Sequence, residues 1–537
     1  MIFAIMAMIL LPLAMALLLL SPALRPVVVR GLGLAPLPAL LLAAAACGGS
    51  VSAFTFPGAW RYVLDQPGAL MLGACALLWI IAGFAASTWL AGRGGRGRFA
   101  LWWLLTLSGS LGVFVAGDVV SFYALYALAS LPAYGLIAFD GGEAERRAGR
   151  VTIAAALIGE GLILAALVLL VVHAPGQGLA ITPLVAALPS SPYCGVIVAL
   201  VVIGFGLKIG LAPLHGWMPM SYAAGPLVAT AVLSGATSKA GLIGLIRFLP
   251  LGEAMPVAGG IILAAGLISA LYGALLGLTQ TNPRSVLAYS SISQLGQMAA
   301  VLGAGLAAGA REAGVIVAFY AVYHVLIKGG LFLMLGTQGR RIAAWQLGLA
   351  GFAALGFAGL PFTGGALGKL AFKDLTASGA TSMLFSLAAV GSTVLVLHFL
   401  RLVRAAAQDP KPQLLSPAAW IAAVIAATPL QWSLFAAVTG ASANSALRPE
   451  VLFDLAWPVA AGAALGWALA AAGTQLPQLP PGDIGARLIA ALERQAGRLA
   501  SAVVRAETQA HQWPVSTLTL AAALILFVAL QTVFGPR

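Results

Sequence analysis

The sequence predicts an all-α polytopic membrane protein with about sixteen transmembrane helices. Hydrophobic residues make up 61% of the 537 residues and charged residues only 8%, whereas soluble chains carry roughly 25% charged residues. Mean hydropathy is +1.01. Apolar stretches of about 20 residues, the length that crosses a bilayer, recur along the whole chain.

The apolar stretches follow one another in order. We place spans near residues 2–20, 33–54, 68–90, 99–116, 118–139, 150–172, 195–216, 225–247, 256–279, 285–305, 313–336, 342–377, 381–402, 415–438, 455–474 and 514–534. The first is a retained helix, because it is too long for a cleaved signal and lacks a basic n-region. The segment 342–377 is too long for one straight span, and Pro361, Gly364 and Gly365 predict an interruption there.

The distribution of basic residues sets the orientation. Sixteen spans put both termini on one side of the membrane. That side receives 5 Arg or Lys residues outside the spans, and the opposite side receives 18. The positive-inside rule makes the opposite side cytoplasmic, so both termini are predicted to face outward. The same asymmetry accounts for the net charge of +13 without a nucleic-acid partner.

Residues 483–512 do not predict a span. Ile484, Leu488 and Leu492 fall on one side of a helical wheel, and arginines cluster beside them. The pattern predicts an amphipathic helix on the cytoplasmic surface, with Asp483 as its N-cap. Such a helix either rests on lipid or braces a neighbouring subunit.

The cysteines predict no cofactor. Cys47, Cys75 and Cys194 are scattered and form no metal or redox motif. They are too few for an iron–sulfur cluster held by four thiolates. No nucleophile–base set indicates a stand-alone enzyme, and we expect neither a metal site nor a bound cofactor.

The lysines lie in unusual places. Five of the six fall within apolar spans: Lys208, Lys239, Lys328, Lys369 and Lys373. A charged side chain at the bilayer centre costs roughly 2.5–3.5 kcal/mol on translocon scales, so such residues usually have a function. A buried lysine can release its proton, whereas arginine stays charged. The pattern therefore indicates a proton or cation path.

Other ionisable residues in or near the spans are candidates for the same path or for local structural roles. His324 lies one helical turn before Lys328, and histidine can relay protons near neutral pH. Glu160 is the clearest acid inside a span and is expected to meet a lysine or water. Lys373 is expected to snorkel or to pair near the interface. For Asp118, at a helix start, a capping role competes with a functional one.

Ordered motifs over roughly residues 100–410 resemble the antiporter-like, proton-translocating subunits of respiratory complex I (NADH-quinone oxidoreductase). The same family includes subunits of Mrp cation/proton antiporters and of membrane-bound hydrogenases. The motifs are Gly206–Pro219 (GLKIGLAPLHGWMP), Leu233-Ser234-Gly235 with Lys239 and Arg247-Phe248, Gln280–Gln294 (QTNPRSVLAYSSISQ), His324-x3-Lys328, and Leu360-Pro361 through Gly368-Lys369.

The resemblance implies an architecture and a path. Fourteen core helices are expected, with helices 4–8 and 9–13 forming two inverted five-helix repeats, and with helices 7 and 12 broken. Lys208 corresponds to the lysine of helix 7 and Lys239 to that of helix 8. His324 and Lys328 correspond to the pair on helix 11, and Lys369 to the terminal residue of helix 12. Protons would move along these residues through ordered water.

The implied organisation divides the chain into five parts. These are N-terminal transmembrane helices (1–98), an antiporter-like proton-conducting core (99–410), additional transmembrane helices (411–482), a cytoplasmic amphipathic helix (483–512) and a C-terminal transmembrane helix (513–537). The resemblance also implies a bacterial inner membrane, in which both termini would be periplasmic.

One position departs from the family pattern. The family has a glutamate on helix 5 that pairs with the lysine of helix 7. Ungapped alignment on Asp118 and Pro132 puts Ala127 at that place, and residues 119–139 contain no acid. Either Glu160 replaces the missing carboxylate, or this half of the path is altered or inactive.

We therefore predict a non-redox membrane subunit of a proton-translocating oxidoreductase complex. Its partners would be the lipid bilayer, other membrane subunits and, in complex I or hydrogenase assemblies, redox subunits. The transported ion would be a proton or Na+. The alternatives are an Mrp-type Na+/H+ antiporter subunit, the membrane subunit of an inorganic-carbon uptake complex, and a non-conducting structural paralogue. The retained lysines argue against the last.

Overall fold

A computed structural model describes residues 2–46, 52–55, 60–337, 342–377, 379–406, 415–472 and 477–483, together with isolated positions between 485 and 501. Contacts divide the chain into two units, Met1–Asp483 and Ile484–Arg537. We describe the first unit below, and the helices predicted at 483–512 and 514–534 lie mostly or wholly outside the described residues.

The first unit is almost entirely helical, as expected for a chain in which apolar stretches alternate with short polar connections. Its N-terminal half contains α1 (Ile2–Leu18), α2 (Arg25–Arg30), α3 (Leu37–Ala46), α4 (Gln66–Trp89), α5 (Arg96–Gly112), α6 (Val119–Ser130), α7 (Ala133–Ile137), α8 (Glu143–Val172), α9 (Ile181–Ala187), η1 (Leu188–Ser190), α10 (Cys194–Ile209), α11 (Trp217–Ala224), α12 (Leu227–Val232), η2 (Leu233–Thr237) and α13 (Lys239–Phe248).

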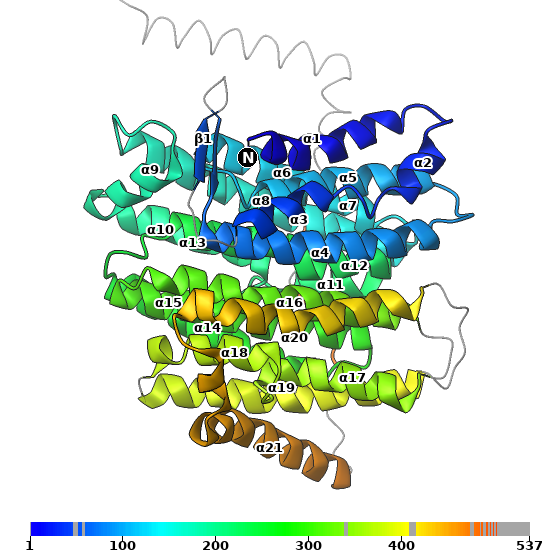
Figure 1. The fold of residues 1–537 in the computed structure, drawn as a ribbon, viewed down its shortest axis with the longest axis vertical. Coiled ribbons are helices and arrows are strands. Elements are labelled where there is room, and N and C mark those ends of the chain that lie inside the picture. Colours follow the sequence, from blue (N-terminus) through cyan, green and yellow to red (C-terminus); the bar gives the residue numbers. More distant parts are fainter. Residues whose placement is uncertain are drawn as a thin grey trace, which may run out of the picture. The chain divides into compact units, whose positions relative to one another are not determined.

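The second half of this unit continues the pattern. It contains α14 (Pro256–Gly277), α15 (Pro283–Ala308), α16 (Glu312–Leu335), α17 (Ala344–Leu355), η3 (Gly356–Ala358), α18 (Gly364–Ala371), η4 (Asp374–Thr376), α19 (Gly379–Ala406), α20 (Pro417–Thr439), η5 (Ala443–Leu447) and α21 (Pro449–Ala471). Figure 1 shows these helices side by side, with α14–α16 between the earlier helices and α17–α19.

Among the described residues, nine helices are long and apolar enough to cross a membrane. Several shorter apolar helices, including α10 and α17, accompany them. These findings establish a multi-pass membrane protein. The count of sixteen spans and the inverted repeats stay predictions.

The predicted helix at 33–54 is wrong at its end. Helix α3 stops at Ala46, and residues Ser52–Thr55 form β1, which pairs antiparallel with β2 (Arg61–Leu64). Short apolar runs do not distinguish a strand from the end of a helix, so the apolar pattern extended the predicted helix into β1. Backbone bonds from Val63 to Val115 and from Gly117 to Arg61 fasten β2 to the α5–α6 connection.

Two helices are interrupted where interruptions were predicted. Helix α10 ends at Ile209 and α11 begins at Trp217, and Gly210 adopts φ +72° at the end of α10. Similarly, α17 and η3 end before Gly359, and α18 begins at Gly364 after the segment that contains Pro361. Each break places non-helical backbone directly beside one of the predicted lysines, Lys208 or Lys369.

Helices α14 and α15 pack with their backbones in close contact, because glycines meet along the line of crossing. A Cβ atom added to Gly266 would lie 2.4 Å from the Ala300 nitrogen. One added to Gly259 would lie 2.3 Å from the Ala307 nitrogen. This contact fixes α15, which carries several polar side chains of the site described next.

Capping accounts for Asp118. Its carboxylate accepts hydrogen bonds from the backbone nitrogens of Val120 and Ser121, at 3.0 and 2.8 Å, at the start of α6. The carboxylate also accepts from the Arg61 nitrogen at 2.6 Å, which joins β2 to α6. Asp118 is therefore a structural residue, and the capping interpretation is confirmed.

Candidate ion-translocation site

A lysine and a histidine meet at the centre of the first unit. The Nζ atom of Lys239, at the start of α13, lies 2.6 Å from Nδ1 of His324 on α16, and both side chains are 0% exposed. Helix α16 is packed among α4, α12, α15, α18 and α20, which excludes lipid from this contact. Two titratable groups in hydrogen-bonding contact can exchange a proton directly.

A π-helical turn precedes Lys239 and shapes its surroundings. In η2 the Ser238 nitrogen bonds to the Leu233 carbonyl, the i→i+5 pattern of a π turn. Nζ of Lys239 donates to the Ser234 carbonyl at 3.3 Å and to Oγ of Ser238 at 3.2 Å. Gly235 lets α16 approach, because a Cβ there would lie 2.8 Å from the Val325 carbonyl oxygen.

Lys328 lies one turn beyond His324 on the same face of α16 and is also fully buried. Its Nζ donates to the Leu287 carbonyl of α15 at 3.1 Å and sits 4.7 Å from the centre of the Phe357 ring. The ring faces the ammonium group in a cation–π contact. A positive charge on His324 would be repelled by positive charges on Lys239 and Lys328.

Lys208 lies at the end of α10, beside the first helix break. Its Nζ donates to Oγ of Ser130, the last residue of α6, at 2.7 Å. Glu160 on α8 is buried and interacts electrostatically with Lys208, but among the described residues the two form no ion pair, and Oε1 of Glu160 has no hydrogen-bond partner. Ser130 is therefore the side chain that binds Lys208 directly.

A cavity of about 30 Å³ connects the surroundings of Lys208 with those of Lys239. Its lining includes Lys208, Ser130, Thr237 and Ser238, and Ser238 accepts the hydrogen bond from Lys239. Most of its lining is apolar, but the polar atoms of these four residues border it, and a cavity of this size has room for about two water molecules. Water there could bridge the two lysines.

Lys369 occupies the far side of the site. It lies on α18 just after the second helix break, and its Nζ donates to Oε1 of Gln297 on α15 at 3.2 Å. A cavity of about 410 Å³ reaches Lys369 and also contacts Lys373 and Asp454. Lys373 and Asp454 form an ion pair at 2.5 Å near the mouth of this cavity, where both side chains are about half exposed.

Three polar residues between Lys328 and Lys369 were not predicted as site residues. Tyr320 donates a short hydrogen bond to Gln294, and Nε2 of Gln294 donates to Oγ of Ser392 at 3.1 Å. Gln297 binds Lys369. The available signal was the pair of glutamines three residues apart inside an apolar span, since such side chains share a helix face.

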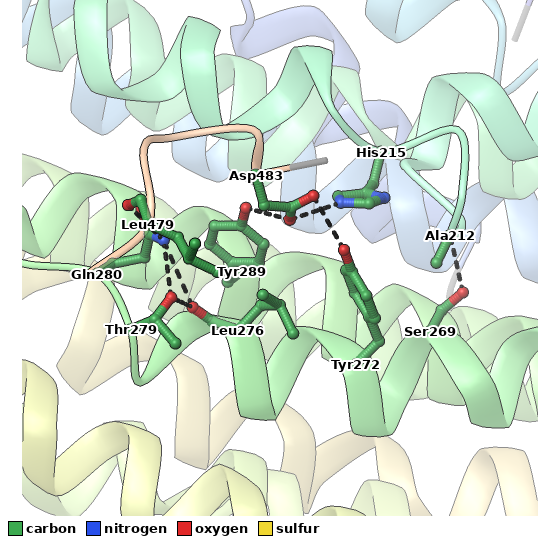
Figure 2. A network of polar contacts seen from close by, with 10 residues as sticks. All are labelled: Ala212, His215, Ser269, Tyr272, Leu276, Thr279, Gln280, Tyr289, Leu479 and Asp483. Carbon is green, nitrogen blue, oxygen red and sulfur yellow. Dashed lines mark hydrogen bonds and ion pairs between the residues drawn. The ribbon is translucent and has the colours of Figure 1, made fainter. Parts of the chain in front are cut away.

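A second buried polar network lies beside the first helix break (Figure 2). Asp483, whose side chain is 0% exposed, contacts His215 at 3.1 Å, Tyr272 at 2.9 Å and Tyr289 at 2.5 Å. These partners come from the α10–α11 break, α14 and α15. The N-cap interpretation of Asp483 did not anticipate these contacts.

The remaining charged residues near the ends of spans make local contacts. His398 on α19 contacts the Gln280 carbonyl at 2.8 Å, and Arg401 donates to the Gly466 carbonyl of α21 at 3.1 Å. Both therefore join neighbouring segments. No group of three or more potential metal-binding side chains occurs within the part of the chain that the structure describes.

Sequence comparisons identify related membrane subunits. A family profile described as "NADH:quinone oxidoreductase/Mrp antiporter, TM" matches residues 116–396. NADH-quinone oxidoreductase subunit N of Desulforudis audaxviator is 29% identical over 68% of this chain and 76% of its own length. Subunit M of the Escherichia coli K12 enzyme is 29% identical over 57% of this chain and 64% of its own length. A hydrogenase-4 component F homolog of Methylacidiphilum infernorum is 33% identical, over 39% and 47% of the two chains.

Solved structures share the fold. A chain of the Mrp complex from Dietzia sp. superposes with a TM-score of 0.76 at 21% identity, covering 100% of this chain and 63% of that one. A chain of an archaeal membrane-bound sulfane sulfur reductase superposes with a TM-score of 0.69 at 20% identity, covering 98% and 100%. With the family profile covering more than half of its residues, this chain belongs to the NADH:quinone oxidoreductase/Mrp antiporter family of membrane subunits.

Proposed function

We propose that this chain is a membrane subunit of a multisubunit complex and translocates protons through Lys208, Lys239, His324, Lys328 and Lys369. The contact of 2.6 Å between Lys239 and His324 carries the proposal. Placing two ionisable groups in a fully buried environment is unfavourable unless their charge is used or compensated. A proton shared between these groups would compensate for part of that cost.

The first half of the path would depend on Glu160. Its carboxylate supplies the charge that favours a protonated Lys208, which the missing helix 5 glutamate would otherwise supply. When Lys208 loses its proton to water in the cavity, it becomes neutral, and the negative charge of Glu160 is then no longer balanced by it. Transfer toward Lys239 would then run through the space lined by Ser238.

The second half of the path would lead from Lys328 to Lys369. The polar side chains of Tyr320, Gln294 and Gln297 line this interval and can orient water between the two lysines. The cavity of about 410 Å³ beside Lys369 would provide the exit. Within the family architecture, these two halves would correspond to the two inverted repeats, and the full chain would have about sixteen spans.

The proposal is tested by proton transport in vesicles that contain the assembled complex. Lys239→Ala should lower transport at least tenfold, because it removes the group that joins the two halves of the path. Lys411→Ala, which removes the one lysine outside the predicted spans, is the matched control and should leave transport unchanged. Transport at the wild-type rate in Lys239→Ala would reject the proposed path.

The parent complex and the ion are tested separately. Several relatives are named as subunits of NADH-quinone oxidoreductase or hydrogenase, so we propose other membrane subunits, and redox subunits beyond them, as partners. Purification of the tagged protein in mild detergent should recover such subunits. Replacing Na+ by choline should leave proton transport intact. Strict dependence on Na+ would instead favour the antiporter alternative.

A further inference from the structure

The backbone on either side of the first helix break is tied directly to Lys208. Nε1 of Trp217, the first residue of α11, donates to the carbonyl of Leu207 at 2.8 Å. Leu207 immediately precedes Lys208. The position of α11 relative to α10 therefore determines where the end of α10, and with it Lys208, is held.

Side-chain hydrogen bonds also hold the break near its start and near its end. The Ala212 nitrogen donates to Oγ of Ser269 on α14 at 2.8 Å, which fixes the break near its start (Figure 2). Near its end, the side chain of His215 is 3% exposed and meets Asp483 through Nε2 at 3.1 Å. His215 lies two residues before Trp217, so a displacement of His215 would also displace Trp217, which donates to the Leu207 carbonyl.

The side chain of Asp483 is buried in the interior of the first unit. Its carboxylate also accepts hydrogen bonds from Tyr272 and Tyr289, which belong to the closely packed helices α14 and α15. Burial alone would raise the pKa of Asp483, but the hydrogen bonds from His215 and Tyr289 hold that pKa well below its ordinary value. An ionised carboxylate bound by several donors is a strong anchor.

The chain around Asp483 is shaped for this contact. Asp483 has a φ of +41°, a region that Asp and Asn adopt more readily than most other residues. Just before it, the Leu479 carbonyl accepts from Nε2 of Gln280 at 3.2 Å, and the Leu479 nitrogen donates to the Thr279 carbonyl at 3.4 Å. Residues 479–483 are thus fastened to the α14–α15 connection at one end and inserted beside His215 at the other.

We propose that Asp483 is a positioning residue that clamps the α10–α11 break through His215 and so sets the place of Lys208. The inference rests on the proposed function, because the clamp affects transport only if Lys208 belongs to the proposed path. The clamp joins the last residues of the first unit to the residue that begins the path.

Backbone hydrogen exchange of residues 206–218 in the assembled complex tests the clamp. Asp483→Asn keeps the size of the side chain and tolerates the backbone conformation, but it removes the charge that strengthens the hydrogen bonds. We expect exchange in this segment to become about tenfold faster, with little change in α16. Asp140→Asn, which removes an exposed carboxylate, is the matched control and should leave exchange unchanged. Unchanged exchange in Asp483→Asn would overturn the clamp.

Proton transport tests whether the clamp positions Lys208. Asp483→Asn should move the pH midpoint of transport, because a displaced Lys208 meets different polar neighbours. Combining it with His215→Gln should add little, since both changes break the same contact. Faster exchange together with a wild-type pH profile would overturn the positioning role.

Two further variants keep these outcomes distinct. Tyr289→Phe removes one donor to Asp483 and leaves the carboxylate unchanged. It serves as the test if Asp483→Asn does not fold, and it should give a smaller increase in exchange of the same segment. Normal transport in Lys208→Ala would reject the proposed function and the positioning role together. The exchange measurement would even then decide whether Asp483 holds the break.

Discussion

At the scale of single residues, the buried ammonium groups are each compensated by neighbours from other helices. Lys208 has Ser130 and Glu160, Lys239 has His324, and Lys369 has Gln297. A charge at the centre of a bilayer costs roughly 2.5–3.5 kcal/mol on translocon scales, so each partner reduces an otherwise unfavourable burial. We therefore expect substitutions of these partners to affect the proposed transport.

Glu160→Gln should lower proton transport about as much as Lys208→Ala does. Glutamine retains the shape of glutamate but not the negative charge that favours a protonated Lys208. Transport by the assembled complex in vesicles measures the effect. Glu143→Gln is the control, because Glu143 lies exposed on the same helix, α8. Full activity in Glu160→Gln would remove Glu160 from the path.

Asp483→Asn should destabilise the protein by on the order of 2 kcal/mol at pH 5–8, where the carboxylate is ionised. Hydrogen bonds lower the folded-state pKa of Asp483, so its stabilising contribution is fully present above the unfolded value of about 3.9. That contribution is lost only as the pH falls through the lower, folded value. Thermal unfolding in detergent should thus show a constant difference from wild type between pH 5 and 8. A difference that vanished at pH 6 would contradict this assignment.

At the scale of elements, the sequence predicts helices well and their partners poorly. Pro361 and the neighbouring glycines predicted the break before α18, because proline and glycine act locally. The contact between Asp483 and His215 joins residues 268 positions apart, and no local pattern encodes such a contact. The β1–β2 hairpin is local, and it was missed for a different reason: the apolar residues of β1 were counted as the end of an apolar span. The lysines inside the spans and the pair Gln294 and Gln297 were visible in the sequence, whereas the contacts of Ser130 and Tyr320 became visible only with the packing.

The α14–α15 contact gives a prediction at this scale. Gly266→Ala should destabilise the protein by roughly 1–3 kcal/mol, because the new methyl group would overlap the backbone of α15. Gly260→Ala on the same helix is the control, since a Cβ there has no neighbour within 4 Å. The control should be neutral or stabilise the helix by up to about 1 kcal/mol. Thermal unfolding distinguishes the two, and equal midpoints would contradict close packing.

At the scale of the whole molecule, α14–α16 lie between α10, which carries Lys208, and α18, which carries Lys369 (Figure 1). Helix α15 contributes contacts to both Lys328 and Lys369, and α16 contributes His324. A path through this centre runs across the bundle rather than along one helix. The two ends of the proposed path would then open on opposite sides of the membrane. The orientation of the chain in the membrane decides which end faces the cytoplasm.

Cysteine labelling tests the predicted orientation. Gly94 and Gly379 both have open space where a Cβ atom would lie, so cysteine fits at either site. In a protein without its native cysteines, Gly379→Cys should react with a membrane-impermeant maleimide added to intact cells. Gly94→Cys should react only with a permeant one, because its loop carries several arginines and is predicted to be cytoplasmic. The opposite pattern would invert the topology.

The π turn before Lys239 also has a consequence for how this segment tolerates changes in length. A π turn holds one residue more than the α-helical turn that it replaces, so η2 amounts to a single-residue insertion. Deleting one residue from Leu233–Thr237 would therefore restore a regular helix in which the residues after it keep their present facing. Straightening the turn without a deletion would instead rotate these residues by about 100° relative to Leu227–Val232. Lys239 would then turn away from His324, so a change that leaves length and hydropathy intact would disconnect the two residues.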